Sequence, residues 1–272
     1  MTETYTSLSL SIQDEEVKEI IIALLSAEGF EGFEETEQGL VAYIPSFLFP
    51  KQIVTQITDQ FSVQATVQEI EAQNWNKLWE SNFQPVKMDK FCMLRADFHE
   101  PDPEVQYDIV VTPKMSFGTG HHATTRLMIS FLQKLELSGK NILDLGTGTG
   151  VLAILSYKMG AGKVTAVDID PWSYENAQEN FTKNNTSIQL YLGGIEQVSH
   201  QTYDVVLANI NLHILLAYME SMYTLTHAGG MLILSGILHS DRDTIVAAAE
   251  EVGFRLKQSQ IEGEWMAVSF QK

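Results

Sequence analysis

From about residue 90 to its end, the chain alternates short apolar runs with longer segments whose apolar residues recur at helical spacing. Runs such as VVLA and LILS are apolar at every position, which is typical of strands buried on both faces of a parallel sheet. The pattern predicts strands at 141–146, 163–169, 188–193, 203–210 and 231–238, and helices at 122–135, 151–159, 171–184, 212–225 and 241–252. This alternation predicts an α/β fold with a mostly parallel sheet.

The C-terminal segment FRLKQSQIEGEWMAVSFQ departs from that alternation. It contains two strand-like stretches joined by a short turn at Gly263, and no helix separates them. We therefore expect an antiparallel hairpin at one edge of the sheet.

The first 72 residues form a separate pattern. Alternating and helical periods follow one another in the order β-α-β-β-α-β, which is the order of a small α+β ferredoxin-like domain. The expected elements are a strand at 5–12, a helix at 14–29, two short strands within 33–44, a helix at 50–61 and a strand at 62–71. The segment contains no Cys/His cluster and no glycine-rich turn, so we expect it to recognise a substrate or to have a structural role.

A short aromatic segment separates the two patterns. Trp75, Trp79 and Phe83 recur every four residues, which places them on one face of a helix, and Pro85 ends that helix. The sequence thus predicts a domain at 1–72, a linker helix at 73–88 and a larger domain at 89–272.

Composition limits the classes of partner. Seventeen Lys and Arg stand against 35 Asp and Glu, for a net charge of −18, so most of the surface would repel the phosphates of a nucleic acid. There is no long apolar run and no signal-like leader, and the single Cys92 cannot form an internal disulfide. We expect a cytoplasmic protein that binds neither nucleic acid nor membrane, and the sequence does not predict its oligomeric state.

The stretch ILDLGTGTG at 142–150 is the first sign of a ligand site. Gly146, Gly148 and Gly150 follow a predicted strand and precede a predicted helix, and together with Asp144 they read D-x-G-x-G-x-G. Glycines in close succession permit positive φ and close approach of a ligand to the backbone. The carboxyl end of a parallel strand is where ligands bind in open α/β sheets.

The same residues bear on two other kinds of glycine loop. Gly148-x-Gly150-x-x-Ala153 fits a dinucleotide fingerprint, which would indicate a nicotinamide-dependent oxidoreductase. The loop lacks the Gly-Lys-Ser/Thr ending of a P-loop, which disfavours a nucleoside triphosphate. The dinucleotide alternative stays open on spacing alone.

Polar side chains end two further strands. Asp168 ends the second strand, where a carboxylate can accept hydrogen bonds from both ribose hydroxyls. Asp170 precedes Pro171 and is the expected N-cap of the next helix. Asn209 ends the strand at 203–210 and can offer its carbonyl oxygen to an amine. Asp168 therefore predicts a nucleoside site, whereas Asn209 taken alone fits the start of a turn at least as well.

The segments SFGTGHHATTRL, DLGTGTG, VDIDP, ANI, LSGIL and EGEW occur in the same order in the ribosomal protein L11 methyltransferases, and WNKLWESNFQP is similar to that family's linker. The resemblance covers about residues 73–272. It implies a class I, Rossmann-like, S-adenosylmethionine-dependent methyltransferase fold.

The resemblance also implies residue roles. Thr125, Gly146, Gly148, Asp168 and Asn209 would contact the cofactor, with Thr125 near its methionine end and Asn209 near its sulfonium. Separately from the resemblance, Phe117 and the turn at 118–120 are expected to form a mobile rim over the pocket, with a plain surface loop as the alternative. His121 and His122 are expected to be loop scaffolding, and no general base is identified.

The activity that the resemblance implies is methylation of lysine and N-terminal amines of a basic ribosomal protein, L11, with S-adenosylmethionine as cofactor and no metal. The residue pattern alone implies only an amine acceptor. Methylation of another amine substrate and NAD-dependent oxidoreduction are the alternatives.

Overall fold

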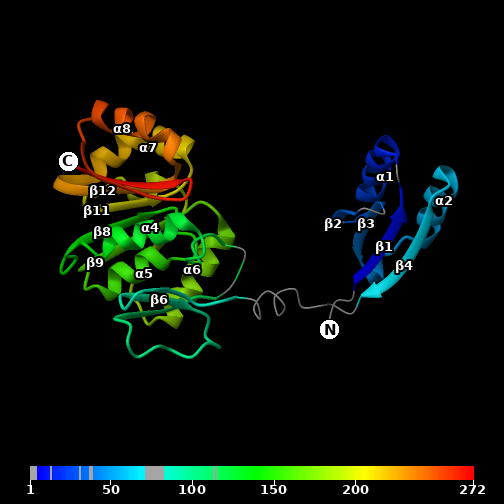
Figure 1. Ribbon diagram of the computed structural model, residues 1–272, viewed down its shortest axis with the longest axis horizontal. Coiled ribbons are helices and arrows are strands. Elements are labelled where there is room, and N and C mark those ends of the chain that lie inside the picture. Colours follow the sequence, from blue (N-terminus) through cyan, green and yellow to red (C-terminus); the bar gives the residue numbers. More distant parts are fainter. Residues whose placement is uncertain are drawn as a thin grey trace. The chain divides into compact units, whose positions relative to one another are not determined.

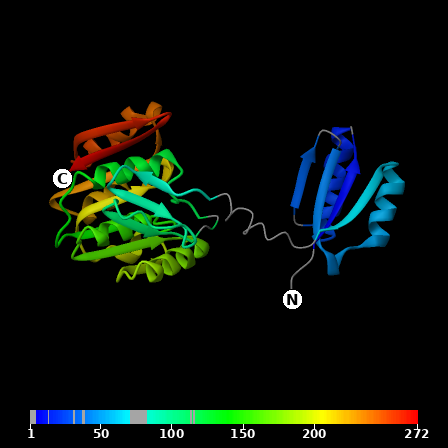
Figure 2. The same ribbon diagram turned by 60° about the horizontal axis from the view of Figure 1, so that its bottom comes forward.

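The computed structural model describes residues 5–12, 14–30, 32–36, 39–70, 83–112, 114 and 116–272. The chain divides into two compact units, residues 1–81 and residues 82–272, and each is described here by itself. Figure 1 labels the elements of both units, and Figure 2 gives a second view of them. None of the helices in the described ranges is long and apolar enough to cross a membrane.

The first unit is a four-stranded antiparallel sheet with two helices, in the strand order β2-β3-β1-β4. Its order β-α-β-β-α-β is the predicted one, and the fold is ferredoxin-like. The elements are β1 (Tyr5–Ser11), α1 (Glu15–Ala27), β2 (Gly32–Thr36), β3 (Gly39–Pro45), the 3-10 helix η1 (Ser46–Leu48), α2 (Lys51–Phe61) and β4 (Gln64–Ile70).

One face of this sheet forms the unit's core. Leu8 of β1 and Ile44 of β3 alternate with outward-facing residues and are fully buried. They form one apolar cluster with Ile21 and Leu25 of α1 and with Ile57 of α2. The two helices therefore cover the same face of the sheet.

The predicted linker at 73–88 is described only in its last part. Trp75 and Trp79 lie outside the described residues. Phe83 is buried, and its ring contacts those of His99 and His121. The predicted linker helix at 73–88 extends too far, because Val86–Met88 form strand β5. The strand begins directly after Pro85, the residue expected to end the helix, and both a proline and the residue before it disfavour a continuing helix.

Strand β5 belongs to a three-stranded sheet that the hydrophobic pattern did not predict. It pairs antiparallel with β6 (Cys92–Arg95), which pairs parallel with β7 (Tyr107–Val110). Asn184, which follows helix α6 (Pro171–Lys183) as its C-cap, connects this sheet to that helix: the backbone N–H of Val110 donates to Asn184 Oδ1 at 3.0 Å, and Asn184 Nδ2 donates to the Val110 carbonyl at 2.6 Å.

The large sheet of the second unit has seven strands in the order β10-β9-β8-β11-β12-β14-β13. Strands β8 to β12 are all parallel to one another, and β14 is antiparallel to both β12 and β13, so the predicted C-terminal hairpin is confirmed. The strands are β8 (Asn141–Leu145), β9 (Lys163–Asp168), β10 (Gln189–Leu192), β11 (Tyr203–Asn209), β12 (Thr226–Leu238), β13 (Arg255–Glu262) and β14 (Trp265–Gln271).

Helices cover both faces of this sheet, which confirms the predicted fold class. They are α4 (Ala123–Leu132), α5 (Val151–Lys158), α6 (Pro171–Lys183), α7 (Leu212–Leu225) and α8 (Arg242–Glu251). Adjacent residues of β8 point into different cores: Ile142 packs in the cluster of α4 and α5, and Leu143 packs in that of α7 and α8. This arrangement leaves the carboxyl ends of β8, β9 and β11 at one edge.

Candidate cofactor-binding site

The glycine loop joins β8 to α5 and has a backbone that only glycine adopts readily. Gly146, Gly148 and Gly150 have φ of 71°, 56° and 82°. A Cβ added to Gly148 would lie 2.3 Å from the carbonyl oxygen of Phe117, and one on Gly146 would lie 2.3 Å from Cγ2 of Ile210. The loop therefore has no room for side chains on its inner side.

Backbone hydrogen bonds hold this loop against two other segments. The N–H of Gly146 donates to the carbonyl of Val167 in β9 at 2.9 Å. On the other side, the N–H of Thr149 donates to the Phe117 carbonyl and Thr149 Oγ1 donates to the Gly118 carbonyl, both at 2.9 Å. The rim segment at 117–120 is thus held against the glycine loop by these hydrogen bonds.

Asp168 ends β9 with its carboxylate beside the loop. Its Oδ2 accepts from the N–H of Gly148 at 2.8 Å, and its Oδ1 accepts from the N–H of Asp170 at 3.0 Å. Asp170 caps α6 by accepting from the N–H groups of Trp172 and Ser173, each at 3.2 Å. The predicted capping role of Asp170 is confirmed by these bonds, and the Asp168 carboxylate lies beside the glycine loop.

Asn209 ends β11 and is 8% exposed. Its Oδ1 is buried and accepts no hydrogen bond from any described residue. The neighbouring Asn211 has a different task, because its Oδ1 accepts from the N–H of Ile214 at 3.1 Å and caps α7. Of the two asparagines, only Asn209 keeps a free acceptor.

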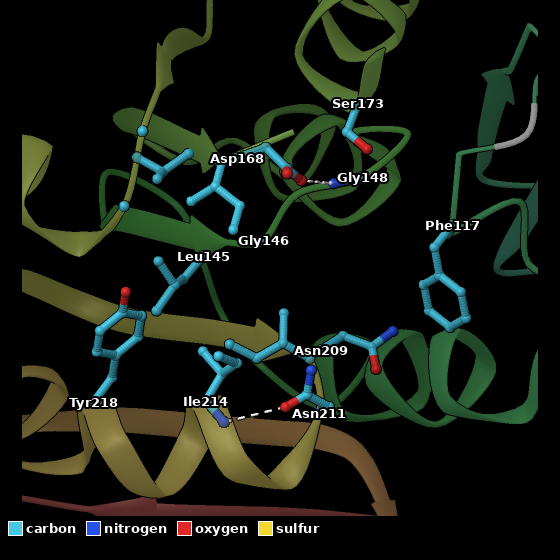
Figure 3. A pocket seen from close by; sticks show the side chains of 15 residues that line it. Phe117, Leu145, Gly146, Gly148, Asp168, Ser173, Asn209, Asn211, Ile214 and Tyr218 are labelled. Carbon is cyan, nitrogen blue, oxygen red and sulfur yellow. Dashed lines mark hydrogen bonds between the residues drawn. The ribbon is translucent and has the colours of Figure 1, made fainter. Parts of the chain in front are cut away.

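These groups surround a cavity of about 290 Å³ at the carboxyl edge of the sheet. Figure 3 shows Asp168 bonded to Gly148 across the cavity from Asn209 and Ile214. The cavity is lined by Phe117, Leu145, Gly146, Gly148, Val167, Asp168, Ile169, Ser173, Gly193, Gly194, Asn209, Ile210, Asn211, Ile214 and Tyr218.

Thr125, in the first turn of α4, lies just outside that cavity. It lines a smaller adjoining space together with Phe117, Gly146 and Asn209, which also line the main cavity. Its Oγ1 is buried and has no hydrogen-bond partner among the described residues. The structure thus brings together all five residues that the sequence analysis named for the cofactor.

Residues 2–272 match the family described as ribosomal protein L11 methyltransferase (PrmA). The chain belongs to this family. The ribosomal protein L11 methyltransferase of Phocaeicola vulgatus is 37% identical over 265 residues, and that of Bacteroides fragilis is 39% identical over 264; each alignment covers 94% of both chains. The crystal structure of ribosomal protein L11 methylase from Lactobacillus delbrueckii subsp. bulgaricus superimposes with a TM-score of 0.64 at 26% identity, over 69% of this chain and 98% of that one.

Family membership makes the chain an S-adenosylmethionine-dependent methyltransferase and selects this interpretation over the nicotinamide-dependent alternative. The residues present fit the cofactor. S-adenosylmethionine carries ribose hydroxyls and an ammonium group, which need acceptors, and the site offers the Asp168 carboxylate and the buried oxygens of Asn209 and Thr125.

Asp144, the first residue of the glycine motif, has a strongly perturbed carboxyl group. It is 1% exposed, and this burial raises the pKa of the carboxyl from its ordinary 3.8 to about 7. The hydroxyl of Thr147 donates to Asp144 Oδ2 at 2.6 Å and partly opposes the shift, while the charge of Asp168 adds to it. Its other oxygen, Oδ1, has no partner among the described residues.

His121 and His122 both act as scaffolding, as the sequence analysis expected, and neither lines the cavity. His122 is the N-cap of α4 and accepts from the N–H of Thr124 at 3.3 Å. Burial, together with the nearby charge of Arg126, lowers the pKa of His122, so its ring stays neutral at pH 7. His121 Nδ1 lies 3.1 Å from the hydroxyl of Thr119.

Sequence reasoning missed the part of the cavity formed by α7. Asn211, Ile214 and Tyr218 recur at helical spacing and share the face of α7 that lines the cavity. The spacing was present in the sequence. It carried no signal of ligand contact, however, because an apolar or aromatic residue at such a position is equally suited to a core.

Proposed function

We propose that this methyltransferase transfers methyl groups from S-adenosylmethionine to lysine and N-terminal amines of ribosomal protein L11. The proposal is supported by relatives of that name that align over 94% of the chain. The observation that carries the assignment of the site is the cavity in which the glycine loop, Asp168 and Asn209 converge, with Asn209 Oδ1 left without a partner among the residues that the structure describes.

Each predicted site residue receives one role in this proposal. Asp168 accepts hydrogen bonds from the ribose hydroxyls, and Gly146 and Gly148 let the cofactor approach the backbone of the loop. Thr125 supplies a hydroxyl for the methionine end. Asn209 lies near the sulfonium and directs its carbonyl oxygen to the acceptor amine, which the partnerless Oδ1 supports.

The chemistry is a displacement at a methyl carbon, and bound S-adenosylmethionine supplies that carbon as a methyl sulfonium. The chain's residues have to align a neutral amine and keep water away. An amine of lysine has a reference pKa of about 10.4, and an apolar surrounding favours its neutral form. Phe117 and Ile214 provide such a surrounding along the cavity, so catalysis rests mainly on alignment and desolvation.

We also propose that the domain at 1–72 recognises L11 and takes no part in holding the cofactor. All the residues proposed for the cofactor follow residue 115, and the first unit has an apolar core of its own. The partner is proposed to be basic, which suits a chain with a net charge of −18.

The test compares two neighbouring carboxylates. Asp168→Ala removes the proposed ribose acceptor and should weaken S-adenosylmethionine binding by about 1.5–3 kcal/mol, roughly ten- to a hundredfold, in calorimetric titration. Asp170→Ala is the control, because it removes a helix cap and should cost about 1 kcal/mol of stability with little change in affinity.

Transfer of labelled methyl groups to purified L11 then tests the acceptor. Asn209→Ala should lower the turnover of L11 methylation more than it lowers cofactor affinity. Equal affinity of wild type and a folded Asp168→Ala protein would contradict the ribose assignment. Transfer to other amines but not to L11 would favour the alternative substrate class.

A further inference from the structure

Some of the polar side chains that line the cavity are engaged with the protein itself. Asp168 accepts two backbone N–H groups, Asn211 Oδ1 caps α7, and Ser173 Oγ donates to Asp170 Oδ2 at 3.0 Å. The amide of Asn209, the Nδ2 of Asn211 and the hydroxyl of Tyr218 make no hydrogen bond to any described residue. Of these free groups, only the hydroxyl of Tyr218 is carried by a ring that packs against the core.

Tyr218 is held by its ring and leaves its hydroxyl to the cavity. The side chain is half-buried and packs at the edge of the core formed by α7, α8 and the sheet. Figure 3 shows the phenol extending from α7 toward Leu145, with its oxygen on the cavity side. Packing of the ring fixes the position of the hydroxyl. Little side-chain entropy of Tyr218 is therefore lost when a ligand forms a hydrogen bond to it.

The labelled residues follow an order along the cavity that matches a nucleoside with a sulfonium tail. In Figure 3, Tyr218 and Phe117 lie toward opposite sides, with Asp168 and Asn209 between them. If Asp168 holds the ribose and Asn209 faces the sulfonium, the base lies on the side of Asp168 that is away from Asn209, toward Tyr218.

The walls of the cavity suit a flat ring with one polar edge. Leu145, Val167 and Ile169 are apolar, and Gly193 and Gly194 contribute no side chains. A phenol hydroxyl both donates and accepts, whereas the adenine edge offers an exocyclic amine and ring nitrogens. We propose that Tyr218 is a specificity-determining residue whose hydroxyl bonds the adenine edge of the cofactor. This inference rests on the proposed cofactor role of the cavity.

Tyr218→Phe removes the hydroxyl and keeps the ring that packs against the core. Calorimetric titration with S-adenosylhomocysteine should show a loss of affinity of about fivefold. The matched control is Tyr157→Phe, because Tyr157 lies half-buried on α5 and is not one of the residues that line the cavity. The control should bind as the wild type does.

A second ligand makes the test specific to the base. S-inosylhomocysteine carries a carbonyl in place of the exocyclic amine, so wild type should prefer the adenosyl ligand and Tyr218→Phe should reduce that preference. If a folded Tyr218→Phe protein binds S-adenosylhomocysteine with wild-type affinity, or prefers it over S-inosylhomocysteine as strongly as wild type does, the proposed role of Tyr218 is overturned. The proposed function of the cavity is not affected by that result. Failure of the wild type to bind S-adenosylhomocysteine would overturn the proposed function of the cavity as well.

Discussion

The two units bury polar groups in different ways. In the first unit, the buried hydroxyls bond within the chain: Thr6 Oγ1 lies 2.9 Å from Ser46 Oγ, and Ser7 Oγ donates to the Gln68 carbonyl at 3.3 Å. Among the described residues of the second unit, six side chains bury a polar atom without a partner: Thr125, Asp144, Thr165, Asn176, Asn209 and Gln260. A buried group without a partner costs about 1–3 kcal/mol, so each needs a reason. Thr125 and Asn209 line the cavities at the carboxyl edge of the sheet, and a bound molecule would complete these two.

Removal of the first unit should produce the largest effect. A truncated protein that begins at Asn74 lacks the proposed recognition domain and keeps all residues proposed for the cofactor. We expect S-adenosylmethionine affinity within about twofold of wild type and a drop of about a hundredfold or more in L11 methylation, measured by titration and by labelled-methyl transfer. Undiminished methylation by the folded truncation would refute the recognition role. Loss of cofactor affinity and stability together would indicate that the first unit only supports the second.

Asp144 should make the stability of the second unit depend on pH. Because burial raises the pKa of this carboxyl to about 7, the folded state binds the proton more tightly than the unfolded state does. The resulting stability is fully present below pH 4 and is lost as pH rises through 7, up to about 4 kcal/mol at 1.36 kcal/mol per pKa unit.

Asp144→Asn removes this titration and keeps an acceptor for Thr147. The free energy of unfolding of wild type, relative to that of the variant, should fall between pH 4 and pH 8 in denaturant titrations. A difference that stays constant over this range would show that the carboxyl of Asp144 does not titrate as its burial predicts.

The sequence predicts those parts of the fold and the site that depend on residues close together in the chain. The glycine loop, Asp168 and Asn209 were predictable because each directly follows an apolar strand, and parallel strands bring their carboxyl ends to one edge. Strands β5 to β7 were not, because they are only three or four residues long and show no sustained period.

Contacts between distant segments were also invisible in the sequence. Asn180 accepts from the N–H of Thr112 and donates to the carbonyl of Thr149, both at 2.8 Å, and so connects α6 to the segment after β7 and to the glycine loop. A polar residue inside a helix gives no indication of such partners, which lie 68 and 31 positions away. The free oxygens of Thr125 and Asn209 likewise become apparent only when every neighbouring donor is placed.

Gly148→Ala tests whether the loop geometry is required for binding, and Gly263→Ala is its control. Both residues have nearly the same positive φ, 56° and 59°, so alanine costs about 1–2 kcal/mol of backbone strain at each. Only at Gly148 would the new Cβ meet a backbone atom, the Phe117 carbonyl oxygen at 2.3 Å, whereas nothing lies within 4 Å at Gly263. We expect cofactor affinity to fall about tenfold or more in Gly148→Ala, and to be unchanged in Gly263→Ala. Equal affinities by titration would place the ligand elsewhere.

The smallest expected effects come from one pair of isosteric substitutions, which tests the contrast between the units directly. Thr6→Val removes a hydroxyl that is hydrogen-bonded within the first unit, and we expect a loss of about 1 kcal/mol in stability with unchanged cofactor affinity.

Thr125→Val removes a buried hydroxyl that has no partner among the described residues, so the protein without cofactor should be as stable as wild type or slightly more stable. Its S-adenosylmethionine affinity should nevertheless fall about fivefold, because the cofactor loses the hydrogen bond that satisfies this group. Thermal unfolding with and without cofactor measures both quantities. A Thr125→Val protein that is destabilised without cofactor and binds it normally would mean that this hydroxyl serves the fold, as the hydroxyl of Thr6 does.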